Sequence, residues 1–171
     1  MRRESPNGQE PANPALVFLT RGEQIESASR GAFAIAGPDG SIAAALGDIE
    51  RIVFPRSAIK LIQAIPLVES GAARAFQVSA EELALACASH SGEPEHVAKV
   101  AGWLARIGAT EDDLVCGPHL PYDVTAAEAL IRAGIAPSRL HNNCSGKHTG
   151  FLCVARHLGV PSAGYDRLDH R

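Results

Sequence analysis

The stretch Ser57-Ala58-Ile59-Lys60 places a hydroxyl and an amine three residues apart. If the stretch is helical, both side chains lie on one face, and the Ser57 Oγ can meet the Lys60 amine. A serine becomes a nucleophile when a neighbour accepts its proton, and a lysine can do so when burial disfavours its charged form. Acyl enzymes with a Ser-x-x-Lys pair work in this way. The alternative is that Ser57 only caps a helix, because so short a pattern recurs by chance.

A second polar cluster follows a predicted buried helix, in the order Cys87-Ala88-Ser89-His90-Ser91-Gly92-Glu93. It offers two hydroxyls, an imidazole and a carboxylate within five residues. The alternative is a plain connection between two helices, in which Ser91 caps the second helix and Glu93 lies near its N-cap. Composition alone favours the plain connection.

A third cluster, His141-Asn142-Asn143-Cys144-Ser145-Gly146-Lys147-His148-Thr149-Gly150, gathers amides, a thiol, an amine and two imidazoles around two glycines. It is not a phosphate-binding loop, because the earlier glycine of G-x-x-x-x-G-K is absent. The paired C-x-x-C or H-x-x-x-H clamp of common zinc sites is also absent. From spacing alone, a catalytic or metal-binding role stays open.

Composition narrows the classes of function. The 171 residues leave room for one domain, or one domain and part of another, and an apolar content of 46% suits a chain with a real core. A formal net charge of -3 gives no electrostatic reason for binding nucleic acid or a membrane surface. No apolar run reaches the length of a membrane helix, and no apolar segment follows the two N-terminal arginines as in a secretory signal. We therefore expect a cytoplasmic protein whose four cysteines are reduced.

The first third of the chain reads as antiparallel strands. Residues 1–14 are polar and predict a flexible leader, and Ala15 to Thr20 predicts a short buried strand. The turn signal Gly37-Pro38-Asp39-Gly40 lies between two apolar runs and predicts a β-hairpin of residues 25–35 and 41–46. Residues 48–54 continue as a connection or a third strand.

From Ser57 onward the pattern is helical. Ser57 is expected to cap a helix that reaches Ser70, with a kink or restart at Pro66. That helix is apolar almost all round, which is typical of the middle of a fold. Further helices are expected over residues 80–88, 93–107, 125–133 and 150–158.

The three clusters, in this order and spacing, resemble the L-asparaginases of the Rhizobium etli type. The opening Arg21-Gly22-Glu23-Gln24-Ile25-Glu26-Ser27 and the end from Gly159 to His170 also fit, so the resemblance covers residues 15–171. It implies a zinc-assisted amidohydrolase that converts L-asparagine to L-aspartate and ammonia, and a homodimer in the full-length family. The implied fold class is α+β and similar to serine β-lactamases and penicillin-binding proteins, with a strand part at residues 15–54 and a helical part at residues 57–160.

The resemblance also implies roles for individual residues. Ser57 would be the nucleophile with Lys60 as its base, and Ser89 the serine of a second Ser–Lys pair. Cys144 and Lys147 would be ligands of Zn²⁺, the lysine in its neutral form. Five residues follow as candidates for substrate binding by their position in the motifs: His90, Glu93, Asn142, Asn143 and His148.

The chain also departs from the pattern of the family. Its members are about twice as long, so this chain resembles a truncated N-terminal half. The lysine partner of Ser89 and the second cysteine of the metal site belong to the part beyond it. Such a chain is expected to expose apolar surface on its helices. Two other hypotheses remain, a β-lactamase-like acyl hydrolase and an inactive remnant. The absence of Ser-Asp-Asn and Lys-Thr-Gly disfavours the former.

Overall fold

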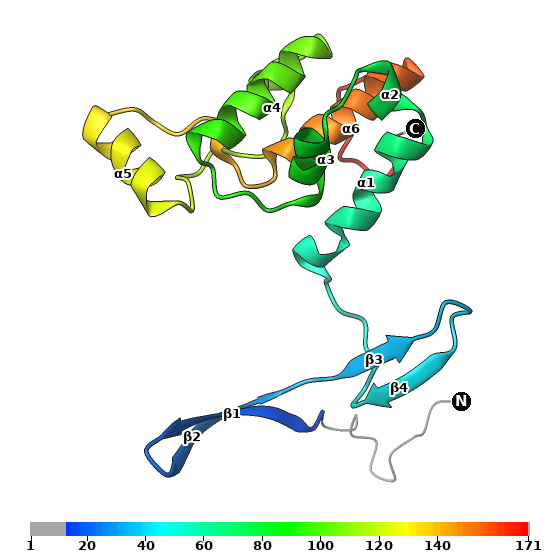
Figure 1. The fold of residues 1–171 in the computed structure, drawn as a ribbon, viewed down its shortest axis with the longest axis vertical. Helices are drawn as coiled ribbons and strands as arrows, with labels where there is room; N and C mark the ends of the chain where they lie inside the picture. Colours follow the sequence, from blue (N-terminus) through cyan, green and yellow to red (C-terminus); the bar gives the residue numbers. More distant parts are fainter. Residues whose placement is uncertain (1–12, 171) are drawn as a thin grey trace. The chain divides into compact units, whose positions relative to one another are not determined.

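The computed structural model describes residues 13–170 and divides the chain into two units, one ending at Phe54 and the other beginning at Pro55. The first contains strands and the second contains helices (Figure 1). The predicted leader at residues 1–14 lies outside the described residues except for its last two. Within the described part, no helix is long and apolar enough to cross a membrane.

The strand unit consists of two separate antiparallel pairs. β1 (Ala15–Arg21) pairs with β2 (Gln24–Arg30), and β3 (Phe33–Ala36) pairs with β4 (Ile42–Leu46). The first strand and the hairpin around Gly37-Pro38-Asp39-Gly40 are confirmed. The single strand predicted over residues 25–35 was wrong, because its first part pairs backward with β1 and only its end joins the hairpin.

The strands are exposed, not buried. Only Ala15 is partly covered, and the other residues of all four strands are exposed. The prediction of a buried strand at Ala15 to Thr20 was therefore wrong. Two-stranded ribbons have no second layer to cover an apolar face, and alone they are marginally stable. Residues 48–54 contain turns and irregular backbone and serve as a connection.

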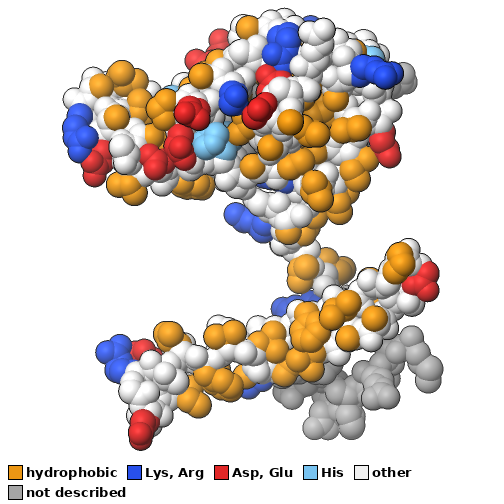
Figure 2. Space-filling view, in the orientation of Figure 1, with side chains coloured by type: hydrophobic (Ala, Val, Ile, Leu, Met, Phe, Trp, Pro, Cys, Tyr) orange, Lys and Arg blue, Asp and Glu red, His pale blue; other side chains and the backbone are white. Residues whose placement is uncertain are grey.

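The helical unit begins with a 3₁₀ helix, η1 (Arg56–Ile59), which continues into α1 (Lys60–Glu69). Pro66 lies inside α1, and Gly71 follows the helix with a positive φ of 85°. The helix is not central. Most of its apolar side chains are exposed, namely Leu61, Ile62, Ile65 and Val68. Figure 2 shows hydrophobic side chains gathered over this part of the surface.

Between residues 72 and 158, four further helices come in the expected order, and three short helices were not predicted. They are α2 (Ala72–Ala75), α3 (Ala80–Cys87), α4 (Pro94–Arg106), η2 (Glu111–Asp113), α5 (Val124–Ala133), η3 (Arg139–His141) and α6 (Ser145–Leu158). The predictions for α3, α4 and α5 are confirmed within one or two residues. The prediction for α6 was wrong at its start, because the helix begins five residues before Gly150. Most of the third polar cluster therefore lies in its first turns.

The core of this unit forms where α3, α4 and α6 meet, with one side of α1 against them. Trp103 is completely buried, and Leu152 and Cys153 of α6 are equally inaccessible. Burial raises the pKa of the Cys153 thiol to about 11, so it stays protonated. It therefore packs as a small buried apolar residue. All four cysteines are free thiols.

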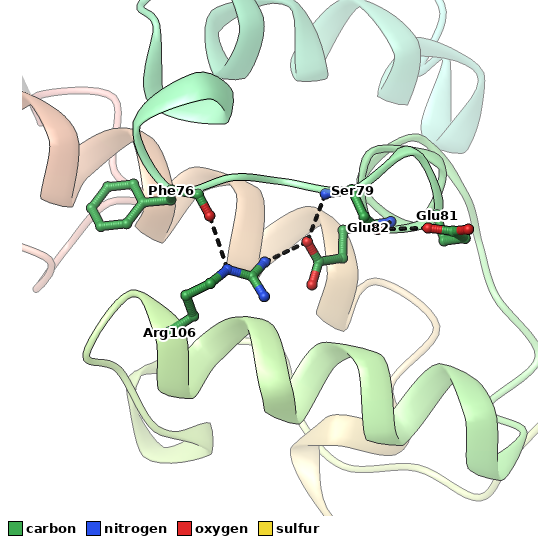
Figure 3. A network of polar contacts seen from close by, with 5 residues as sticks. All are labelled: Phe76, Ser79, Glu81, Glu82 and Arg106. Atoms are coloured by element: carbon green, nitrogen blue, oxygen red, sulfur yellow. Dashed lines mark hydrogen bonds and ion pairs between the residues drawn. The ribbon is translucent and has the colours of Figure 1, made fainter.

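A buried acid joins α3 to α4 (Figure 3). Glu82 is 6% exposed and accepts a hydrogen bond from the backbone N–H of Ser79, which completes the capping box of α3. Its carboxylate also pairs with Arg106 of α4, whose Nε donates to the carbonyl of Phe76 at 2.9 Å. One carboxylate therefore fixes both the start of α3 and the distance to α4.

The backbones of α3 and α6 lie close together at Gly146. A Cβ at this position would lie 2.6 Å from the carbonyl oxygen of Leu85, much closer than real Cβ atoms approach backbone. One turn later, a Cβ at Gly150 would make only ordinary contacts, at 3.5 Å or more. The first turn of α6 can therefore reach the end of α3 only because residue 146 is glycine.

Candidate active site

Ser57 lies within η1, on the exposed surface of the helical unit. The prediction that it caps a helix was wrong, because Pro55 precedes η1 and Ile59 precedes α1 as the N-cap residues. Proline fixes its own φ near the helical value, so Pro55 can start the 3₁₀ turn without a side-chain cap. The hydroxyl of Ser57 is thus free for another partner.

Arg56 has a φ of 53°, in the left-handed region that non-glycine residues rarely adopt. This conformation lies between Pro55 and the nucleophile candidate in the chain. Backbone strain of this kind costs on the order of 1–3 kcal/mol and clusters at functional sites. The strain next to Ser57 is typical of a functional site, although it does not itself give Ser57 a role.

Three side chains form one continuous hydrogen-bonded chain. The Nζ of Lys60 lies 2.8 Å from the Oγ of Ser89, and that Oγ lies 2.9 Å from the Oγ of Ser57. Within the described residues, Lys60 makes no direct hydrogen bond with Ser57, although the spacing in the sequence favoured one. Ser89 lies between them, so the first two polar clusters meet at one point.

Lys60 is buried, with 2% of its surface exposed. Its Nζ has two neutral oxygen partners, the hydroxyl of Ser89 and the carbonyl of Ala88 at 2.6 Å. Among residues 13–170, no carboxylate forms an ion pair with it. Since Ser57 and Ser89 are exposed while Lys60 is covered, a substrate can reach the hydroxyls but not the amine.

The residues before and after Ser89 are both fixed by hydrogen bonds. The helix α3 ends at Cys87, and Ala88 turns to an extended conformation with a ψ of 163°. The carbonyl of Ala88 accepts from Lys60, and the N–H of His90 donates to the carbonyl of Asn143 at 3.1 Å. The second and third polar clusters therefore lie side by side.

His90 has partners on both ring nitrogens. Its Nδ1 accepts from the N–H of Gly92 at 3.2 Å, so the ring proton is on Nε2, which lies 2.8 Å from the Oγ of Ser145. Ser145 in turn donates to the carbonyl of Leu140 at 2.9 Å. Burial, aided by the nearby His96 and Lys60, lowers the pKa of His90 to about 4, so the ring is neutral at pH 7. Sequence reasoning missed Ser145, although it lies inside the third cluster.

Asn142 and Asn143 connect the third cluster to neighbouring loops. The Oδ1 of Asn142 accepts from the N–H of Cys144, and its Nδ2 donates to the carbonyl of Gly117 at 2.6 Å. The N–H of Asn143 donates to the Nε2 of His119 at 3.0 Å. These contacts support the loop before α6, and the predicted substrate contacts of both residues stay predictions.

Glu93 is the N-cap residue of α4 and makes no side-chain capping bond. Its Oε1 accepts from the hydroxyl of Ser91 at 2.6 Å. The predicted cap at Ser91 was wrong, since the N-cap lies two residues later. Glu93 is exposed, and the hydrogen bonds of its side chain do not join the Ser57–Ser89–Lys60 chain.

His148 contacts Tyr165, in the segment that follows α6. Its Nδ1 lies 2.9 Å from the hydroxyl of Tyr165, which accepts from the N–H of Val115 and therefore donates to the histidine. Burial and the nearby Lys147 lower the pKa of His148 to about 4, and burial raises the pKa of Tyr165 to about 12. No pattern in the sequence indicated Tyr165.

Cys144 and Lys147 lie at the beginning of α6, the first as its N-cap residue and the second in its first turn. The Nζ of Lys147 lies 5.7 Å from the centre of the Phe151 ring, a cation–π contact. The described residues contain no group of three His, Cys, Asp or Glu side chains that could hold a metal ion. Two donors do not make a metal centre, so these residues alone do not fit Zn²⁺, and no chemical step below passes through it.

Comparison with protein families places the chain in a known family. The model of the family described as L-asparaginase II matches residues 17–171, which includes all three polar clusters. A search of curated proteins found no match.

Proposed function

Because the chain belongs to the L-asparaginase II family, which is of the asparaginase type of amidohydrolase, we propose that it hydrolyses L-asparagine through an acyl-enzyme on Ser57. The observation that supports this best is the hydrogen-bonded chain from Ser57 through Ser89 to Lys60. It connects an exposed nucleophile to a buried amine through a hydroxyl that both donates and accepts.

The first step is attack of the Ser57 oxygen on the side-chain carboxamide carbon of asparagine. In the structure Lys60 donates to Ser89 and Ser89 donates to Ser57, so the reaction requires both hydroxyls to rotate and Lys60 to have given up a proton. As the new C–O bond forms, the Ser57 proton then passes to the Ser89 oxygen, and the Ser89 proton passes to the Lys60 amine. Lys60 is then an ammonium. Lys60 then returns this proton through Ser89 to the amide nitrogen, the C–N bond breaks, and the nitrogen leaves as ammonia while the acyl group stays on Ser57.

The second step repeats this route with water. Water attacks the acyl carbon, its proton moves through Ser89 to Lys60, and the returning proton restores the Ser57 hydroxyl as aspartate leaves. In this scheme Ser89 is the proton relay, and Lys60 is the base for Ser57 through Ser89. Ser89 therefore takes part in the reaction of Ser57 and Lys60, in addition to the second Ser–Lys pair that the resemblance implies for it.

The finer classification belongs to the same proposal. The chain is of the Rhizobium etli type, has a serine β-lactamase-like fold, and is the N-terminal part of a longer enzyme. Two of the three motifs that carry the resemblance contribute to one hydrogen-bonded chain, which supports the assignment to this type. Zn²⁺ binding at Cys144 and Lys147 stays a prediction, and the metal content of the purified chain with and without a chelator tests it.

Ammonia release from L-asparagine tests the proposal, with Ser57→Ala, Lys60→Met and Ser89→Ala compared in parallel. Removal of any one member should lower kcat by a factor of at least about 10³, and the double variant of Ser89 and Lys60 should be no worse than either single variant, because the residues act as a unit. Full activity in Ser89→Ala would eliminate the relay, whereas full activity in Ser57→Ala would eliminate the acyl-enzyme. Hydrolysis of a chromogenic β-lactam, but not of asparagine, would favour the β-lactamase-like alternative.

A further inference from the structure

His90 and Ser145 form a buried hydrogen-bonded pair between two distant segments of the chain. They are 55 residues apart in sequence, one after the end of α3 and the other at the first residue of α6. Both are buried, with 4% and 0% of their surfaces exposed. Buried polar groups that are fully hydrogen-bonded specify one arrangement of the elements that carry them.

The N–H of the His90 ring and the O–H of Ser145 both already have partners within the protein. The imidazole uses both nitrogens, toward Gly92 and Ser145, and the hydroxyl of Ser145 both accepts from His90 and donates to Leu140. Because the ring is neutral at pH 7, the pattern of donors and acceptors is fixed in one tautomer.

The position of Ser89 depends on what holds its two neighbours. On one side, the carbonyl of Ala88 accepts from Lys60. On the other side, the backbone N–H of His90 donates to Asn143 and its ring donates to Ser145, so two bonds tie this residue to the start of α6. Among the residues that the structure describes, Ser89 itself is bonded only through its hydroxyl, to Lys60 and Ser57.

We propose that the hydrogen bond between His90 and Ser145 is a positioning device that holds the Ser89 hydroxyl between Lys60 and Ser57. His90 is thus a positioning residue for Ser89, and the substrate contact that the motifs implied for it stays a prediction. The inference rests on the proposed function, since the hydroxyl that it places is the proposed relay. A shift of Ser89 by about 1 Å is enough to break a hydrogen bond on either side, and misplacement of that size can cost about 10²-fold in rate.

The experiment uses Ser145→Ala in the full chain, with Thr149→Val as the matched control. Thr149 lies one turn later in α6, is equally buried, and uses its hydroxyl only toward the carbonyl of Ser145. Both variants lose one buried hydroxyl from the same helix. Only Ser145→Ala should lower kcat for ammonia release, by about 10- to 100-fold, with KM unchanged.

A conservative variant separates positioning from bulk stability. The amide nitrogen of Gln reaches about as far as the Nε2 of histidine, so His90→Gln keeps a donor toward Ser145, and His90→Leu does not. The glutamine variant should keep kcat within about threefold of the unsubstituted chain, whereas the leucine variant should match Ser145→Ala. Equal kcat values in His90→Gln and His90→Leu, measured on chains of comparable stability, would overturn the proposal.

Hydrogen exchange supplies a readout that does not depend on activity. Ser145→Ala should raise the exchange rate of the backbone amides of Ser89, His90 and Gly92 more than Thr149→Val does. Unchanged exchange there would overturn the positioning role, whatever the activity. If the unsubstituted chain folds and releases no ammonia, the proposed function fails, and the exchange result alone then decides whether the pair positions Ser89.

Discussion

At the scale of single residues, Lys60 combines two properties that pull in opposite directions. A long side chain with a titratable end is 2% exposed, and its hydrogen-bond partners in the described part of the chain are neutral oxygens. Burial of an amine without a charged partner lowers the stability of the folded state, and proteins often retain such a group because it is needed for function. The residue is thus better explained by chemistry than by folding.

Replacement of Lys60 by methionine should therefore separate stability from activity. Methionine has a similar length and no charge to desolvate, so we expect the free energy of unfolding to stay within about 1 kcal/mol or to rise. Ammonia release should be lost. Urea denaturation and the ammonia assay on the same sample check both parts, and a loss of more than about 3 kcal/mol would show that the amine is structural.

The two histidines with lowered pKa values make stability depend on pH. His90 and His148 have pKa values of about 4 in the folded chain, below the ordinary 6.5. As pH falls below 6.5 the unfolded chain takes up protons that the folded chain does not, so the stabilisation is complete above 6.5 and disappears on approach to 4. For the buried His90 this amounts to about 3 kcal/mol.

Urea denaturation at about pH 7.5, 6.0, 5.0 and 4.5 measures this effect. The midpoint should fall steadily between the first and the last of these values. His157→Gln, at an exposed position in α6, is the control, and its urea midpoint should fall with pH in the same way as that of the unsubstituted chain. A midpoint that does not move across this range would contradict the neutral, buried state of both rings.

At the scale of secondary structure elements, each end of α3 contacts a different helix. Glu82 joins its first turn to α4, and Gly146 lets α6 approach its last turn. The segment that carries Ser89 follows directly. The geometry of the candidate site therefore depends on contacts that are not part of it.

Removal of the Arg106 side chain tests the first of these contacts. Arg106→Met should lower the free energy of unfolding by about 2 kcal/mol, because Glu82 is buried and would lose its charged partner, although the arginine is itself about one third exposed. Arg132→Met is the matched control, since its ion pair with Glu128 within α5 is exposed on both sides and should be worth less than about 1 kcal/mol. If Arg106→Met and Arg132→Met lower the thermal stability equally, the buried ion pair contributes no more to stability than the exposed one.

Two glycines of α6 test the second contact. Gly146→Ala places a methyl group against the backbone of Leu85 and should destabilise the chain by about 1–3 kcal/mol, despite the better helix propensity of alanine. Gly150→Ala meets only ordinary contacts and should be neutral or stabilising. Opposite signs in urea denaturation are the expected result, and a stable Gly146→Ala chain would refute the close approach.

How far the sequence predicts these elements depends on where their signals come from. The helices α3 and α5 have local signals, a capping box at Ser79 and a left-handed glycine at Gly134, and both were predicted closely. The start of α6 has no such signal, since its N-cap residue Cys144 makes no capping bond and two glycines follow. That Ser89 lies between Ser57 and Lys60 could not be predicted, because the arrangement depends on how distant helices pack. The motifs indicated the participants, and only the fold shows their order.

At the scale of the whole molecule, each unit leaves apolar surface uncovered. The strands of the first unit are exposed, and α1 exposes much of its apolar side (Figure 2). Monomeric proteins rarely leave apolar side chains exposed in continuous patches, and patches of this kind promote association. The expectation of exposed apolar surface on the helices is therefore confirmed within the described residues.

We expect the chain to associate in a concentration-dependent way through α1. The double variant Ile62→Lys with Val68→Lys, at positions 64% and 55% exposed, should lower light scattering at micromolar concentration. Ile131→Lys changes a comparably exposed residue of α5, and it is the control for the added charge. Equal reductions in the double variant and in the control would show that the effect of charge is general and that α1 has no particular part in association.

The contact between His90 and Ser145 has a further consequence for the timing of synthesis. A ribosome delivers Ser57, Lys60 and Ser89 well before Ser145, which closes a loop of 55 residues. Closing such a loop costs entropy that only the docked α6 can repay, so long-range contacts of this kind form late. During translation the nascent chain would therefore carry all three reacting groups without their alignment. On the proposed mechanism, activity would therefore begin only after the first turn of α6 has emerged and docked.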